Sequence, residues 1–363
     1  MTALLQGKQV LSRLAGMVNT YDGMIQPKQC DFLAPDELSV GGPISWHESP
    51  DSFQLGLTPD PSGTLPPAVT YSGTLALAKG AWVKILTTGA RGTAQFRTYL
   101  DGLGVTPVEA SNQTTAATYV IPGTSLTVNF PVGAYTNDNV YKGVGNPVND
   151  KTANLYHLVN TTGGTRPYVI TVGPLGGLPI WRFDGANDRQ IGPSAMATAV
   201  CGGTDNPFMV TALVNVNAVP TGAATACIFT ASHTTDADIP LCELRMTSTA
   251  WQLNRRATAA NSKFATSAII PSTGGHLLIW GFDGSSSFLR DNGVYVIGGD
   301  SGVAGTGMAL AAATTFNQFC VGMRSISGGL DEPCSMDLVS LVTHTAPPAT
   351  LAELEMYESY FLQ

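Results

Sequence analysis

The chain has 363 residues, enough for two domains of roughly 150 residues each, and a net charge of −8 at pH 7. Its Lys and Arg residues are scattered and form no basic stripe, which excludes nucleic acid as a partner. No run reaches the ~18 apolar residues of a membrane helix, and the first residues lack the pattern of a secretion signal, so no membrane insertion is expected.

Residues 1–67 read as a docking helix followed by a Pro-rich arm. Apolar residues recur at spacings of three and four between residues 3 and 18, which predicts an amphipathic helix. Its apolar stripe consists of Leu4, Leu5, Val10, Leu11, Leu14 and Val18. The helix is too isolated to build a core, so we expect it to dock on a partner subunit or on the second domain. The prolines that follow predict an extended, irregular arm.

Residues 68–149 alternate between apolar and polar side chains and are broken by glycines, which predicts a small antiparallel β-domain. The segments that define it are Val83-Lys-Ile-Leu-Thr-Thr-Gly89, Gly92-Thr-Ala-Gln-Phe96, Ile121-Pro-Gly-Thr-Ser-Leu126 and Phe130-Pro-Val-Gly-Ala-Tyr135. This succession resembles a β-domain of tail and virion proteins of bacterial viruses. A Gly-rich linker over residues 150–177 follows it.

Residues 178–363 contain about ten short apolar segments at near-regular spacing, which predicts a sandwich of two antiparallel sheets. Four landmarks occur in order: Trp181-Arg-Phe-Asp-Gly-Ala-Asn-Asp188, Phe288-Leu-Arg-Asp-Asn-Gly293, Phe319-Cys-Val-Gly322, and Met336 to Val342 followed by Leu351 to Phe361. This order resembles the jelly roll of the concanavalin A-like lectin and glucanase superfamily, in its laminin-G-type branch. The fold expected for the whole chain is therefore all-β, with a short terminal helix.

The acidic segment Glu353-Leu-Glu-Met-Tyr-Glu358 is similar to the catalytic strand of the glucanase branch. However, Thr350 is placed to cap a helix with Glu353 three residues later, so the segment is better explained as a terminal helix. We therefore expect no catalytic residue and no enzyme activity. Replacing Glu353 and Glu358 together is expected to leave folding and any binding largely intact.

Aromatic side chains give the better indication of a ligand site, because sugars stack their apolar ring faces on Trp or Tyr. The residues proposed to bind a ligand are Trp251, which has polar neighbours, Tyr295, and His276 at the rim of the sandwich. The laminin-G resemblance implies a calcium ion held by loop oxygens, for which Asp236 and Asp238 are the candidates. No other cofactor is expected. The six cysteines are expected to be free thiols, with disulfides in the C-terminal half left open.

Two functions follow from these features. The first is a non-enzymatic structural protein of a virus particle, either a bacteriophage capsid decoration protein or a tail or fibre component, that displays a lectin-like domain for adhesion to a host surface or glycan. Its partners would be other virion proteins, further copies of itself and a cell-surface glycan. It would assemble in the host cytoplasm and be exposed outside the cell. The alternative is a free-standing carbohydrate-binding protein or a weak glycoside hydrolase.

Overall fold

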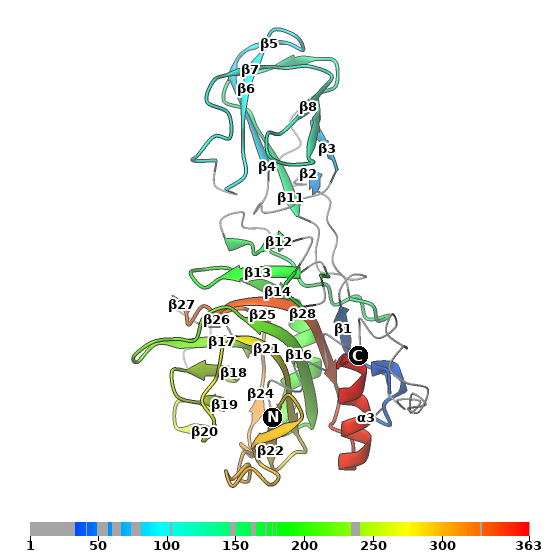
Figure 1. Cartoon of the computed structure of the whole chain (residues 1–363), viewed down its shortest axis with the longest axis vertical. Helices are drawn as coiled ribbons and strands as arrows, with labels where there is room; N and C mark the ends of the chain where they lie inside the picture. Colours follow the sequence, from blue (N-terminus) through cyan, green and yellow to red (C-terminus); the bar gives the residue numbers. More distant parts are fainter. Residues whose placement is uncertain are drawn as a thin grey trace, which may run out of the picture.

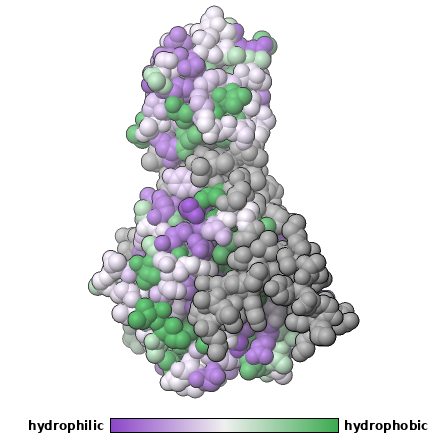
Figure 2. Space-filling model, in the orientation of Figure 1, coloured by the Kyte–Doolittle hydropathy of each residue, from purple (hydrophilic) through white to green (hydrophobic). Residues whose placement is uncertain are grey.

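The structure is a computed structural model that describes residues 33–40, 42–48, 57–59, 67–73, 81–101, 104–145, 150–160, 165–170, 173–175, 177–178, 180–233, 240–326 and 329–362. Its regular structure is almost entirely antiparallel β, which confirms the predicted all-β class. Figure 1 shows a smaller β-domain at one end of an elongated molecule and a larger β-sandwich at the other. Figure 2 shows hydrophilic and hydrophobic residues interspersed over the coloured part of this face.

The small domain consists of two sheets and a short ribbon that bury apolar side chains. Its larger sheet has the order β2 (Leu57–Pro59), β11 (Val140–Gly145), β4 (Ala81–Thr87), β6 (Gln95–Tyr99) and β7 (Gln113–Thr114). The smaller sheet contains β3 (Thr70–Ser72), β9 (Thr127–Asn129) and β8 (Thr118–Val120), and the ribbon pairs β5 (Gly89–Ala90) with β10 (Ala134–Tyr135). Phe96 and Phe130 pack ring to ring at 4.7 Å among these side chains. The predicted period-two alternation of β4 appears as alternating buried and half-buried side chains.

The first sheet of the sandwich, here called sheet I, is built around three long neighbouring strands. Its order is β12 (Tyr168–Ile170), β13 (Ile180–Asp184), β28 (Ser335–His344), β16 (Phe208–Val216), β21 (Gly274–Phe282), β22 (Ser287–Asp291) and β23 (Val294–Ile297), with β1 (Ser45–Glu48) also paired to β28. Strands β16 and β28 are buried along nearly their whole length. They read as continuous apolar runs because both faces of sheet I are covered.

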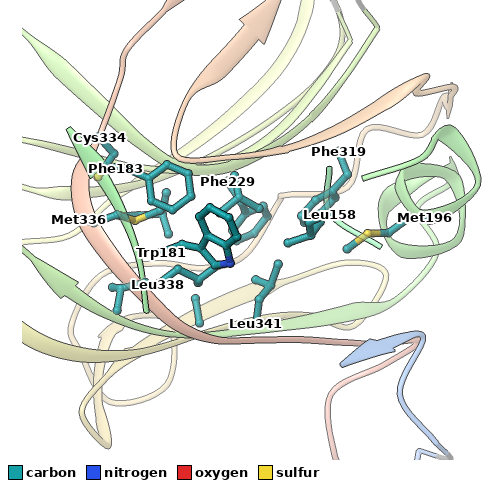
Figure 3. Packing of buried hydrophobic residues seen from close by; sticks show 14 of the residues in the cluster. Leu158, Trp181, Phe183, Met196, Phe229, Phe319, Cys334, Met336, Leu338 and Leu341 are labelled. Carbon is teal, nitrogen blue, oxygen red and sulfur yellow. The ribbon is translucent and has the colours of Figure 1, made fainter. Parts of the chain in front are cut away.

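The second sheet, here called sheet II, packs against one face of sheet I. Its order is β14 (Gln190–Gly192), β25 (Gln318–Val321), β17 (Thr225–Ser232), β18 (Leu241–Thr247), β19 (Trp251–Thr258) and β20 (Asn261–Thr266). Phe229 of sheet II stacks on Trp280 of sheet I at 5.8 Å and on Phe319 at 5.5 Å. Figure 3 shows Trp181, Phe183 and Phe229 in this core between the sheets. The predicted two-sheet sandwich is therefore present.

The other face of sheet I is covered by helix α3 (Leu351–Phe361). Thr350 caps this helix by accepting a hydrogen bond from the Glu353 backbone N–H at 3.3 Å, as the sequence predicted. Leu354, Tyr357 and Phe361 of α3 are buried in a second apolar cluster with residues of sheet I. The helix therefore closes the sandwich on the side opposite sheet II, as Figure 1 also shows.

Part of the predicted irregular arm is regular and docked on the sandwich. A 3-10 turn, η1 (Pro35–Glu37), precedes β1, and β1 extends sheet I by pairing with β28. The Leu33 N–H donates to the Met356 carbonyl of α3 at 3.2 Å, and the Ser39 N–H donates to Glu353 Oε1 at 3.0 Å. The sequence did not reveal this strand, because its partner lies almost 300 residues away. The apolar stripe from Leu4 to Val18 lies outside the described residues.

Short elements complete the sandwich. They are helix α2 (Ser194–Cys201), the pair β15 (Gly203–Thr204) and β24 (Ala313–Thr314), and the hairpin of β26 (Arg324–Ile326) with β27 (Gly329–Asp331). The structure explains two of the glycines that the sequence motifs contain. Asn292 and Gly293 both have positive φ in the two-residue turn that joins β22 to β23. Gly322 has a φ of +86°, and a Cβ at this position would lie 2.2 Å from the Phe183 ring.

Candidate functional site

A surface pocket of about 520 Å³ lies on the α3 side of sheet I, next to strands β22 and β23. This volume is within the range of small-ligand sites. The pocket is formed by the turn after β21, by β22 and β23, and by the chain segment that leads into α3. The residues that line it are Pro207, Asp283, Ser286, Ser287, Phe288, Tyr295, Gly299, Ala346, Pro347, Pro348 and Ala349. Of the three predicted ligand-binding residues, the structure places Tyr295 in this wall.

The Tyr295 ring is held by contacts on several sides. It meets the Phe288 ring edge to face at 5.8 Å, and the Arg290 guanidinium lies 4.6 Å from its centroid. Arg290 is itself fixed by Glu358 of α3, with N–O distances of 2.6 and 2.9 Å. A Cβ at position 299 would come within 2.6 Å of the Tyr295 ring, so only glycine fits there. The ring is thus preorganised and still half-buried rather than covered.

Asp283 gives the pocket a fixed acceptor. Its Oδ1 accepts hydrogen bonds from the Ser285 and Ser286 backbone N–H groups at 2.8 Å each and from the Ser285 hydroxyl at 2.9 Å. Burial alone would raise the pKa of Asp283, but these donors outweigh it and hold the pKa below its ordinary value. The carboxylate is exposed and ionised at neutral pH, so it can accept hydrogen bonds from ligand hydroxyl groups.

The other two predicted ligand-binding residues point into the core, which corrects the sequence-based interpretation. Trp251 has no exposed surface, and His276 is 2% exposed. Their rings meet edge to face at 5.5 Å between the two sheets. His276 Nδ1 lies 2.8 Å from Asp291 Oδ1, and its Nε2 lies 2.9 Å from the Ser272 carbonyl oxygen. A stacking platform needs an exposed face, so the prediction that Trp251 and His276 meet a ligand is wrong.

A second group of polar side chains lies on the face of sheet II that points away from the core, here called the outer face of sheet II. Leu244 and Leu253 pair across β18 and β19 in the core, so the adjacent Glu243 and Asn254 point outward. Asn254 Nδ2 donates to Glu243 Oε1 at 2.9 Å. Arg245, on the same face, lies 3.3 Å from Glu243 Oε1.

The hairpin of β26 and β27 adds to this group at its edge. Arg324 Nη1 lies 3.0 Å from Glu332 Oε1, and Arg245 Nη1 lies 3.2 Å from the same oxygen. Burial raises the pKa of Glu243, while Asn254 and Arg245 pull it down. The sequence carried a signal for this face in the polar side chains that recur at every second position of β18 and β19, but the spacing of residues could not place the hairpin of β26 and β27 beside them.

The calcium prediction remains a prediction. Asp236 and Asp238 lie outside the described residues. Within the described part of the chain, no three His, Cys, Asp or Glu side chains come together as a metal site. The cysteines at 201, 227, 242, 320 and 334 are buried free thiols. None of the described helices has the length and hydropathy needed to span a membrane.

Comparison with known proteins gives structural similarity only. No protein-family model matches the chain, and no curated protein matches it. The chain is similar to the CBM40 domain of the Ruminococcus gnavus IT-sialidase bound to α2,3-sialyllactose, with 10% identity, 42% of this chain and 82% of that chain covered, and a TM-score of 0.36. It is also similar to the botulinum neurotoxin serotype C1 binding domain, with 7% identity and a TM-score of 0.43. This match covers 60% of this chain and 49% of that chain.

A third similar structure is the leech intramolecular trans-sialidase complexed with 2,7-anhydro-Neu5Ac, with 8% identity and a TM-score of 0.35. This match covers 43% of this chain and 24% of that chain. Identities and TM-scores this low do not relate individual residues of these proteins to residues of this chain. The candidate site therefore rests on the geometry of the chain itself.

Proposed function

We propose that the protein is a non-enzymatic adhesion protein whose β-sandwich binds a glycan in the Tyr295 pocket. The observation that carries this proposal is the combination, in one open pocket, of a half-buried aromatic ring with an exposed, ionised carboxylate. A sugar ring has apolar faces that stack on an aromatic side chain, and hydroxyl groups that donate to fixed acceptors. Tyr295 and Asp283 supply these two functions, and Pro347 and Pro348 add an apolar wall.

We further propose that this domain is displayed on a virus particle, as a bacteriophage capsid decoration protein or a tail or fibre component. The docking helix and Pro-rich arm predicted for residues 1–67 support this proposal, as does the small β-domain. The low content of charged residues, 12%, suits close packing against other virion proteins and further copies of the chain. The protein would assemble in the host cytoplasm and act outside the cell.

One observation favours a second candidate, a weak glycoside hydrolase. Glu243 and Glu332 both approach Arg245 Nη1, at 3.3 and 3.2 Å, so two carboxylates lie near each other on the outer face of sheet II. Glycosidases use such pairs as acid and nucleophile. In this protein, however, guanidinium groups occupy the space between the carboxylates, and Glu243 is fully buried. The pair is better suited to holding the hairpin than to bond cleavage.

The test of glycan binding uses the full chain on a glycan array, followed by calorimetric titration of the best oligosaccharide. Tyr295→Ala is expected to weaken binding about tenfold or more, because it removes the stacking ring. Tyr295→Phe keeps the ring and should retain most of the affinity. Val294→Ala, at the exposed neighbouring position, should change nothing. The proposal fails if no glycan binds, or if Tyr295→Ala binds as the wild type does.

The hydrolase and virion proposals have separate tests. Release of reducing sugar by the wild type, abolished in Glu243→Gln and Glu332→Gln, would establish the hydrolase instead. For the virion proposal, the full chain and a variant lacking residues 1–67 are mixed with the other structural proteins of the particle and sedimented. Only the full chain should co-sediment. Absence of any affinity for those proteins would contradict it.

A further inference from the structure

Four polar side chains lie in register across four neighbouring strands of sheet I. Tyr168 of β12 pairs with Arg182 of β13, and Arg182 pairs with Asp337 of β28. Asp337 in turn pairs with Asn215 of β16. Side chains that are directly opposite on adjacent strands lie on the same face of a sheet. These four residues therefore form one continuous group, here called the polar row.

The polar row faces away from the core between the two sheets. Its neighbours along the strands, Trp181, Leu338 and Val214, belong to that core, and Figure 3 shows the first two of them there. Successive residues of a strand point to opposite faces, so the polar row lies on the α3 side of sheet I. Two positions further along β13 and β16, Ile180 and Leu213 belong to the apolar cluster that α3 covers. The polar row thus borders the covered part of this face.

Asp337 is a buried acceptor that fixes three side chains around it. Its side chain has no exposed surface. Arg182 donates to it from Nε at 2.6 Å and from Nη2 at 3.0 Å. Asn215 and Asn217 each donate from Nδ2, at 3.2 and 3.1 Å. The hydrogen bonds from Arg182 to Asp337 raise the pKa of the guanidinium, which stays ionised. The three side chains are therefore held in place before any ligand binds.

The outward atoms of this group reach solvent. The Arg182 side chain is 41% exposed. Within the described residues, neither Arg182 Nη1 nor Asn215 Oδ1 makes a hydrogen bond, and neither atom is buried. Asn217 is exposed, and Tyr168, at the end of the row, is half-buried. A fixed donor, a fixed acceptor and an aromatic ring on one open face are the groups that recognise a sugar.

The charges of the polar row favour a neutral ligand over an anion. Arg182 and Asp337 balance each other in one ion pair. Asp184, two positions after Arg182 on β13, is exposed on the same face and would repel an anion. Hydroxyl groups carry no charge, and they can accept from Arg182 and donate to Asn215 at the same time.

We propose that the polar row is a second binding site, which takes a neutral oligosaccharide. Strands are about 4.8 Å apart, so the row from β12 to β16 is about 14 Å long and suits more than one sugar ring. One ring would stack on Tyr168, and hydroxyl groups would bind Arg182 and Asn215. This inference rests on the proposed glycan-binding function for its ligand class. Tyr295 lies on β23, at the opposite edge of sheet I, so the two sites share no residue.

The experiment compares the wild-type full chain, Arg182→Lys and Tyr295→Ala on one array of neutral and acidic glycans. Arg182→Lys keeps the charge beside Asp337 but loses the planar fork that serves Asp337 and a ligand together. Signals from neutral glycans should be lost in Arg182→Lys and kept in Tyr295→Ala. Arg97→Lys, in the small domain, makes the same chemical change and should leave the array unchanged.

The strongest glycan that depends on Arg182 is then titrated by calorimetry. Arg182→Lys should weaken its binding about tenfold or more. Tyr168→Ala should weaken it by a similar factor, whereas Tyr168→Phe keeps the ring and most of the affinity. Asn217→Ala, at an exposed position, should weaken it about fivefold. Melting temperatures close to that of the wild type check that these variants fold, and Asn217→Ala serves as the test if Arg182→Lys does not fold.

The outcomes separate this site from the Tyr295 pocket. Glycan signals that only Tyr295→Ala loses, with wild-type binding in Arg182→Lys and Asn217→Ala, would overturn the second site and support the first. Signals that only Arg182→Lys loses would support the second site and overturn the first. Arg182-dependent binding of acidic glycans alone would overturn the assignment to a neutral ligand.

Discussion

Gly322→Ala tests whether the two sheets pack as described. Two effects of the substitution can be estimated from the structure. Gly322 has a φ of +86°, which costs an L-residue about 1 kcal/mol. The new Cβ would also lie 2.2 Å from the Phe183 ring in the core between the sheets, and overpacking of this kind costs about 1–3 kcal/mol. The free energy of unfolding should therefore fall by about 2–4 kcal/mol.

Gly222→Ala is the matched control in the same sandwich. Gly222 has a φ of +62°, but no atom lies within 4 Å of the position its Cβ would take. This variant should lose only about 1 kcal/mol. Both are measured by urea denaturation followed by tryptophan fluorescence, comparing midpoints at equal slope.

A double variant separates the clash from the backbone effect. Adding Phe183→Ala to Gly322→Ala removes the ring that the new methyl group strikes. The two substitutions together should therefore cost less than the sum of the two alone, by about 1 kcal/mol or more. Equal losses in Gly322→Ala and Gly222→Ala, or strict additivity in the double variant, would refute the described packing of β13 against the end of β25.

Three further predictions concern buried charges and the terminal helix. Burial lowers the pKa of His276, but Asp291 and the Ser272 carbonyl outweigh it, so the net pKa is raised. The resulting stability is complete below the unfolded value of 6.5 and is lost as pH rises through the folded pKa. The melting temperature should therefore fall as pH rises above about 6.5, and an equal fall in His276→Gln would contradict this. Glu358→Ala leaves Arg290 buried without its partner. The free energy of unfolding, measured by urea denaturation at mildly alkaline pH, should therefore fall by about 3–5 kcal/mol. A fall of less than about 1 kcal/mol would show that the ion pair is dispensable. Thr350→Ala removes the cap of α3 and should cost about 1 kcal/mol, measured in the same way, with no loss contradicting the capping role.

The sandwich could be predicted because its strands carry their own signals. Strands β16 and β28 are apolar runs of strand length, and Asn292-Gly293 marks a tight hairpin. The cap of α3 was also predictable, since Thr350 and Glu353 have the spacing of a capping box. These features are local, so a window of a few residues contains the information.

The contacts that decide function are not local. Trp251 has polar sequence neighbours, yet it points between the sheets because the alternate positions of β19 face outward. The alternation was visible, but the sequence did not show which set faced the core. The sequence did not show that Glu358 is buried beside Arg290, because these two residues are 68 positions apart. We now expect replacement of Glu358, unlike that of Glu353, to destabilise the fold. The Tyr295 pocket likewise joins segments that no spacing rule connects.

The most direct test of the central claim is a crystal structure of the full chain soaked with the oligosaccharide that binds best on the array. Density is expected for one sugar ring stacked on Tyr295, with a hydroxyl group within hydrogen-bond distance of Asp283. A bound sugar whose contacts lie only on the small domain would contradict it. An empty Tyr295 pocket under conditions where the oligosaccharide is shown to bind would contradict it as well.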